Sequence, residues 1–143
     1  MTSRDLAGSL MRQAESRKAT LQVAMGEENW AYVVRLSQEI VELSLKAILN
    51  FVGVEPPKWH DVGTLMVKYS RRLPADIALR ADELARISAR LRENRERSMY
   101  GDELLGQGPD DLYGRPDAEQ ARRWAEEIFN LCRGHMTFDE RAD

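Results

Sequence analysis

Hydrophobic positions recur at helical spacing along most of the chain. The first such segment starts after Thr2 and Ser3, either of which can accept a hydrogen bond from an unpaired N–H group at a helix start. Gly26 closes the segment, and Arg17 falls on its apolar face, where a long side chain is expected to pair at the rim. The predicted apolar face consists of Leu6, Leu10, Ala14, Leu21, Ala24 and Met25.

The second segment, over residues 29–52, is the most hydrophobic of the chain. At about 100° per residue its apolar side chains cover more than half of the circumference, so neighbours must cover the helix on two sides. This pattern predicts the central helix of a bundle, with Ser37 and Ser44 at close helix approaches. The apolar residues are Tyr32, Val33, Leu36, Ile40, Val41, Leu43, Ala47, Ile48 and Phe51. The remaining strip carries two i,i+4 pairs, Arg35 with Glu39 and Glu42 with Lys46.

A proline-containing linker follows Gly53 and leads to a short predicted helix over residues 61–71. Its inward positions are Val62, Leu65, Met66 and Tyr69. His60 and Asp61 stand at its start. With no Cys, Ser or second His nearby, His60 is expected to hydrogen-bond the backbone at the helix start and not to act as a general base.

A longer helix is predicted over residues 75–99, after Pro74. Its buried stripe is Ile77, Leu84, Ile87 and Leu91, and the same angular count places Asn94, Arg95 and Ser98 on that stripe. Arg86, Arg90 and Arg97 share the opposite, solvent-facing side. Because an unpaired buried guanidinium is too costly, Arg95 is expected to have a partner or to face a cleft or an anion.

The last part of the chain combines a loop with a final helix. Residues 101–116 are rich in Gly, Asp and Pro, and Leu104, Leu105 and Tyr113 are expected to fasten this loop to the surface. Loops of this length are often functional. Asp117 is expected to cap a helix whose buried side is Ala118, Ala121, Ala125, Ile128, Phe129 and Cys132. Trp124 and Leu131 fall outside this buried side and suggest a second apolar contact, such as a dimer interface. Residues 134–143 are expected to be frayed, and His135 within them is not expected to be catalytic.

Composition narrows the class of protein. The 143 residues fit a single domain, residues 1–143, with 31% charged and 43% hydrophobic residues. A net charge of -3 excludes a generally basic nucleic-acid coat but leaves room for a local basic patch. The single cysteine favours a reducing, cytoplasmic compartment. Since the sequence shows neither a signal-peptide pattern nor a long apolar run, we expect an unprocessed protein without a membrane partner. Two histidines and one cysteine, far apart, lack metal-ligand spacing, so we expect neither a metal nor another cofactor.

The order of these features resembles the HEPN domain family (higher eukaryotes and prokaryotes nucleotide-binding). The similarity covers roughly residues 14–133 and lies in the stretches WAYVVRLSQEIVELSLKAILNFVG, PPKWHDVGTLM and RENRERSMYGD. Its matching residues are Glu42, Lys46, Gly53, His60, Arg95, Tyr100 and Gly101. The resemblance implies an all-α, up-and-down bundle of four to five helices that dimerises through the helices bearing the arginine motif. It also implies a minimal nucleotidyltransferase partner in a toxin–antitoxin-type system.

Ribonuclease members of this family carry an arginine followed a few residues later by histidine, and here Tyr100 stands where they have the histidine. A phenol, with an unperturbed pKa of about 10, is a poorer general base at neutral pH than imidazole at about 6.5.

Three hypotheses follow. In the first, the protein binds nucleotides or RNA through Arg95, Asn94, Ser98, Tyr100 and Asp102. In the second, it is a metal-independent ribonuclease with Arg95 and Tyr100 as catalytic residues. In the third, it is a structural interaction module in which Arg95 pairs with an acid such as Glu42 across the bundle.

Overall fold

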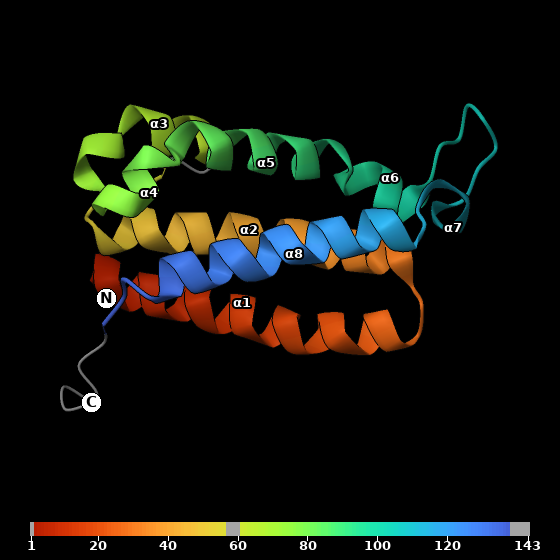
Figure 1. The fold of residues 1–143 in the computed structure, drawn as a ribbon, viewed down its shortest axis with the longest axis horizontal. Coiled ribbons are helices and arrows are strands. Elements are labelled where there is room, and N and C mark those ends of the chain that lie inside the picture. Colours follow the sequence, from red (N-terminus) through yellow and green to blue (C-terminus); the bar gives the residue numbers. More distant parts are fainter. Residues whose placement is uncertain (1, 57–60, 138–143) are drawn as a thin grey trace.

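The fold is an all-α bundle, seen in a computed structural model that describes residues 2–56 and 61–137. Regular structure in these ranges is helical, apart from one isolated β-bridge. The elements are α1 (Ser3–Gly26), α2 (Trp30–Phe51), α3 (Val62–Lys68), the 3-10 turn η1 (Ser70–Arg72), α4 (Ala75–Leu79), α5 (Ala81–Glu93), α6 (Arg95–Tyr100), α7 (Pro109–Leu112) and α8 (Arg115–Arg133) (Figure 1). None of the described helices is both long and apolar enough to cross a lipid bilayer.

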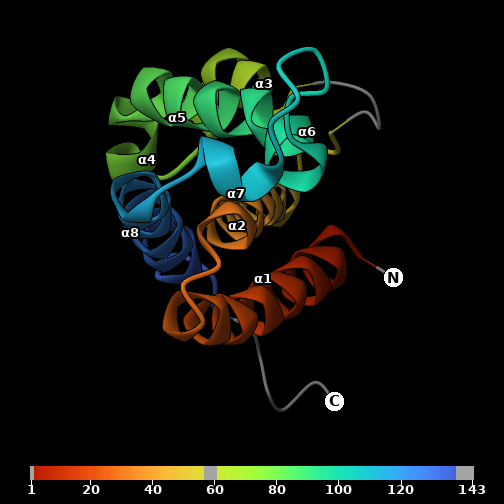
Figure 2. The same cartoon turned by 90° about the vertical axis from the view of Figure 1, so that its right-hand side faces the viewer.

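Helix α2 is the centre of the bundle, as its apolar circumference predicts. It packs on α1, α8, α5, α6 and α3, and the end-on view shows α2 enclosed between these neighbours (Figure 2). The long helices α1, α2, α5 and α8 run alternately along the bundle, so the predicted up-and-down arrangement is confirmed (Figure 1).

Helix α1 begins with a reciprocal cap. The Asp5 N–H donates to Thr2 Oγ1 at 3.1 Å, and the Thr2 N–H donates to Asp5 Oδ2 at 2.9 Å. Arg17 lies at the rim and pairs with Glu39 at 3.7 Å, as expected. Of the predicted apolar face, Ala14, Leu21 and Ala24 are buried and Leu10 and Met25 are partly buried, which confirms most of it; Leu6 is exposed instead, and Ala7 and Met11 lie inward.

Helix α2 confirms most of its predicted pattern. Ser37 and Ser44 are fully buried, and the Ser37 hydroxyl donates to the Val33 carbonyl at 2.7 Å. Glu42 and Lys46 form the predicted pair at 3.4 Å. Tyr32 was expected on the buried arc but is exposed; it lies in the first turn, at the end of the bundle.

The short third helix begins where the sequence predicts. The Asp61 carboxylate accepts from the Gly63 N–H at 3.0 Å, and the predicted inward residues Val62, Leu65 and Met66 are buried. Helix α3 ends at Lys68 and the chain continues as η1, so the predicted helix over 61–71 is split. His60 lies outside the described residues.

The predicted helix over 75–99 is broken twice, which corrects the angular count made from the sequence. The buried stripe of Ile77, Leu84, Ile87 and Leu91 is confirmed. One break lies at Arg80 and the other at Asn94, whose amide side chain donates to the Arg90 carbonyl at 3.1 Å. Asparagine side chains compete in this way for backbone groups, so the helix ends at Glu93 and restarts at Arg95.

The segment after α6 is largely the predicted loop, but it contains a hairpin turn closed by one β-bridge and the short helix α7. The backbones of Asp102 and Gln107 pair through two hydrogen bonds of 2.8 and 3.0 Å. Tyr113 is buried, as expected, and fastens the segment to the bundle. Leu104 and Leu105 were expected to do the same, but they are 98% and 68% exposed because they lie in the turn between the paired residues.

Helix α8 has the predicted buried side, with all six residues inward. Asp117 was expected at the cap position, but the helix begins at Arg115 with Gly114 as the N-cap; Asp117 lies in the first turn, and its carboxylate accepts from the Gly114 N–H at 2.9 Å. Trp124 and Leu131 are half-buried and pack against the core. Beyond the helix, His135 contacts Asp76 and Met136 is buried, so the chain is fixed at least as far as Met136; residues 138–143 lie outside the described ranges.

Candidate functional site

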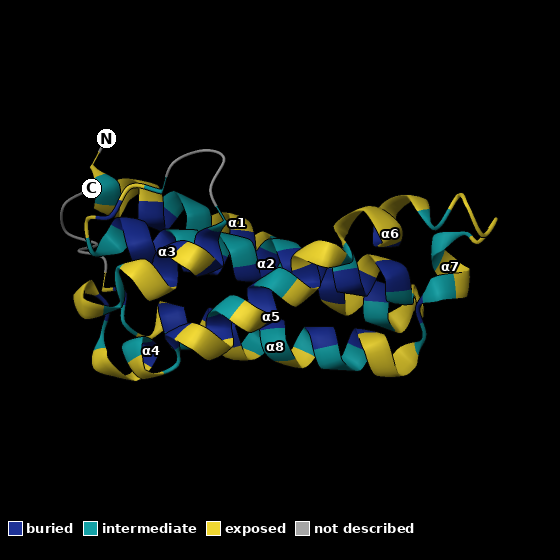
Figure 3. Ribbon diagram, turned by 90° about the horizontal axis from the view of Figure 1, so that it is seen from above, coloured by how far each residue is buried: buried dark blue, intermediate teal, exposed yellow. Residues whose placement is uncertain are grey.

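The residues singled out by the sequence lie at one end of the bundle, on and around α6. This short helix rests on α2 where α5 stops, and most of it is exposed (Figure 3). Ser98 is its buried residue, 5% exposed, and the Ser98 hydroxyl donates to the Arg95 carbonyl at 3.0 Å. Ser98 therefore fixes the helix and leaves the other side chains outward.

Asn94 joins three elements at the start of α6. Its amide group donates to the last turn of α5, and its Oδ1 atom accepts from the Tyr113 hydroxyl at 2.9 Å. Burial raises the pKa of Tyr113 above its ordinary value, an effect that Arg97 opposes and Asp117 reinforces. The phenol therefore stays protonated and serves as a donor to Asn94. Sequence reasoning assigned Tyr113 only an apolar contact, and its hydroxyl contact lies 19 positions away along the chain.

Arg95 is exposed, in contrast to its predicted place on the buried stripe, because the break at Asn94 changes the direction of the helix. Among the described residues, none forms a hydrogen bond or ion pair with its guanidinium. The pairing with Glu42, which the third hypothesis gave as an example, does not form. Glu42 instead accepts from Gln38 at 2.8 Å and pairs with Lys46 at 3.4 Å.

Tyr100 and Asp102 lie on either side of a glycine that turns the chain. Tyr100 is 66% exposed. The Asp102 carboxylate accepts from the Leu105 N–H at 3.2 Å, so it stabilises the turn. Gly101 has φ +78°, and a Cβ there would collide with the Gln107 carbonyl oxygen. The structure thus brings Arg95 and Tyr100 to the surface of the same end, and the contacts of Asn94, Ser98 and Asp102 are with the backbone or Tyr113. A ligand role for these five residues stays a prediction.

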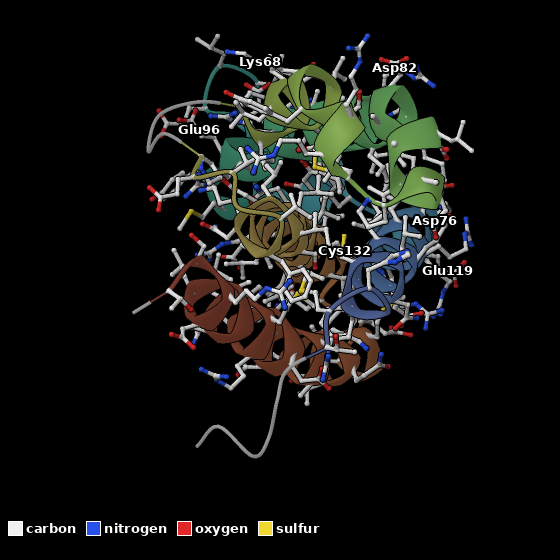
Figure 4. All side chains as sticks on the ribbon, turned by 90° about the vertical axis from the view of Figure 1, so that its left-hand side faces the viewer. Lys68, Asp76, Asp82, Glu96, Glu119 and Cys132 are labelled. Carbon is white, nitrogen blue, oxygen red and sulfur yellow. The ribbon has the colours of Figure 1, made fainter. Side chains whose placement is uncertain are left out.

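The other titratable groups that the sequence raised lie elsewhere. His135 Nε2 lies 2.7 Å from Asp76 Oδ1 at the opposite end of the bundle from α6, and this hydrogen bond lowers the pKa of Asp76 (Figure 1). Cys132 lies deep among the helices, whereas Glu96 of α6 lies at the edge (Figure 4). Complete burial raises the pKa of Cys132 to about 12, so its thiol is not a nucleophile at neutral pH.

A shallow depression lies beside this end, on the outer side of α5. Arg86, Ala89, Arg90, Glu93 and Asn94 line it. The sequence placed Arg86 and Arg90 on the solvent-facing side, which the structure confirms, but gave no signal that the surface between them is hollowed.

Comparison with known proteins supports the similarity noted in the sequence. The family model of the HEPN domain matches residues 7–135, which is most of the chain. Comparisons with curated proteins and with solved structures found no match.

Proposed function

The chain belongs to the HEPN domain family, and on this premise we propose that it binds nucleotides or RNA as a homodimer that acts with a minimal nucleotidyltransferase partner in a toxin–antitoxin-type system. The observation that carries the proposal is Arg95, an exposed arginine with no partner within the described residues, on the same short helix as the exposed Tyr100. Such a pair offers one group for a phosphate and one for a base.

The chemistry of the two side chains supports this division of roles. A guanidinium presents a planar fork of donors that matches two phosphate oxygens, and here no described acid competes for it. An exposed phenol ring can stack on a base of any identity, and its hydroxyl can donate to a substrate oxygen. Arg95 is therefore assigned to phosphate contact and Tyr100 to base contact.

The surface around these residues supports a homodimer. Met99, Leu104 and Leu105 are exposed apolar side chains that follow one another along α6 and the hairpin; we call them the hairpin patch. Exposed apolar clusters of this kind mark interaction sites, and a second copy would cover the patch and bring two Arg95 side chains to one seam. Trp124 and Leu131 already pack against the core, so they offer less uncovered surface.

A binding titration tests the phosphate role. Wild-type protein is titrated with nucleotides and short RNAs beside Arg95→Ala and the control Arg12→Ala, which removes an exposed arginine from the outer face of α1. A hydrogen bond to a charged group contributes about 1.5–3 kcal/mol, so Arg95→Ala should weaken binding roughly 10- to 100-fold. Absence of saturable binding, or equal affinities for the two variants, contradicts the proposal.

The ribonuclease alternative is decided with the same proteins. RNA is incubated in EDTA with wild type, Arg95→Ala and Tyr100→Phe. Cleavage that both substitutions abolish would assign a metal-independent ribonuclease, and RNA that stays intact supports binding without cleavage. A gene for a minimal nucleotidyltransferase next to the gene for this chain would support the two-component system.

A further inference from the structure

The arginines of this protein fall into two groups. Those on most helices have partners in the structure, among them Arg17, Arg72, Arg80, Arg92, Arg115 and Arg122. Exposed arginines whose side chains have no ion pair or hydrogen bond in the described part of the chain include Arg12, Arg71 and Arg95. Arg86, Arg90 and Arg97 share this property, and they follow one another along α5 and α6. We call these three residues the α5 arginine face.

Two of the three arginines, Arg86 and Arg90, line one hollow. Arg86 and Arg90 lie one turn apart on α5, and the small side chain of Ala89 between them leaves the shallow depression described above. Arg97 is not part of the lining; it lies on the adjoining α6, and its charge acts on Tyr113, whose hydroxyl donates to Asn94 in the lining. Glu93 is the acidic residue in the lining, and Glu83, near Arg86, is already held by Arg80 at 3.0 Å.

This face is separate from Arg95. Residues two positions apart on a helix point to different sides, so Arg95 and Arg97 of α6 do not share a surface. The protein also has a net charge of -3, so a cluster of unpaired arginines is a local exception.

Resting on the proposed function, we propose that the α5 arginine face binds the phosphodiester backbone of an RNA strand without regard to its sequence. Unpaired guanidinium groups displace the counterions of phosphates and bind them as bidentate donors. An acidic protein would satisfy the charge, but protein interfaces are centred on buried aromatic or aliphatic anchors. The lining of the depression offers only Ala89 as an apolar side chain, which favours the nucleic acid.

The salt dependence of RNA binding tests this inference. The probe is single-stranded polyuridine RNA, and the variant is Arg86→Gln/Arg90→Gln/Arg97→Gln. Each phosphate contact adds about 0.7 to the slope of log K against log salt concentration, so the triple variant should lose about 2 from this slope. The control Arg12→Gln/Arg71→Gln removes exposed arginines from α1 and η1 and should leave the slope unchanged.

The outcomes separate the two proposals. If the wild type does not bind polyuridine, the arginine face is refuted, and the titration with nucleotides and short RNAs decides the proposed function by itself. If it binds with a slope that the triple variant does not change, the arginine face is refuted and the role of Arg95 stands. The matching triple lysine variant keeps the charges and should restore most of the slope. Competition by polyglutamate that equals competition by RNA, and depends on these arginines, would assign the face to an acidic protein and overturn the inference.

Discussion

Helix α2 and the end of the bundle formed by residues 94–113 differ in how far their side chains are buried and in the interactions that hold them. In α2, Leu45, Ala47, Ile48 and Leu49 are fully buried, and neighbours cover the helix on several sides. In residues 94–113, Ser98 and Tyr113 are the buried residues, and the remaining side chains are exposed or half-exposed (Figure 3). Apolar packing holds the first region, whereas a few directional hydrogen bonds hold the second.

This difference separates stability from binding. A helix covered on several sides has little surface left for a ligand, so its substitutions act on folding. The exposed end offers arginines, a phenol and an apolar patch, and its substitutions should act on partners.

The largest effect is expected for a truncation in α2. Leu45→Ala removes a fully buried side chain and should lower the free energy of unfolding by about 2–5 kcal/mol, since it leaves a cavity among α2 and its neighbours. Urea unfolding of wild type, Leu45→Ala and the control Leu104→Ala measures this. The exposed Leu104 should change the value by no more than about 0.5 kcal/mol. Equal losses for the two variants would contradict the comparison.

Alkaline pH should lower the free energy of unfolding, because the buried thiol of Cys132 is protonated in the folded chain. Burial raises the pKa of this thiol from 9.0 to about 12, so the unfolded chain releases its proton first. The stability that depends on the neutral thiol is fully present below about pH 9 and is lost as pH rises toward 12, by about 1.4 kcal/mol per pH unit. Urea midpoints between pH 8 and about pH 10.5 measure the slope. Cys132→Ala is less stable at neutral pH, but its free energy of unfolding should fall less as the pH rises. If the stability of the variant falls with pH as steeply as that of the wild type, the thiol of Cys132 is not the cause.

At the exposed end, the hairpin depends on one glycine. Gly101→Ala adds a Cβ that collides with the Gln107 carbonyl oxygen at φ +78°, so we expect the pairing of Asp102 with Gln107 to open at a cost of about 1–3 kcal/mol. Amide hydrogen exchange at Asp102 and Gln107 reports the opening. Gly106→Ala is the matched control, because its φ is +66° but no atom lies within 4 Å of the added Cβ. Gly106→Ala should increase exchange at these amides less than Gly101→Ala does. A larger increase for Gly106→Ala would show that the chain adjusts to the added Cβ at residue 101 without opening the pairing.

The two regions also differ in how far their sequence predicts them. The patterns of α2 and α8 are long and continuous, so their type, position and buried side follow from apolar spacing alone. The structure of residues 94–113 depends on side-chain hydrogen bonds, which the spacing of apolar residues does not predict. The side chain of Asn94 ends a helix where the spacing predicts one continuous helix over residues 75–99, and the hydroxyl that holds it comes from Tyr113. Arg95 was identified by its place in a motif, but its exposure follows from this break.

The smallest effect on stability, with a large effect on assembly, is expected for the hairpin leucines. Leu104→Ser/Leu105→Ser should change the free energy of unfolding by no more than about 0.5 kcal/mol per site, because both side chains are exposed in one copy of the chain. If the hairpin patch is the seam of a homodimer, the same change exposes polar groups where two copies meet, and light scattering at micromolar concentration should move from the dimer mass toward the monomer mass. Leu79→Ser is the control, since Leu79 is equally exposed on α4 at the other end of the bundle and should leave the mass unchanged. A wild type with the monomer mass would refute the homodimer. A double variant that keeps the dimer mass would show that the dimer interface lies on another face and does not include the two leucines.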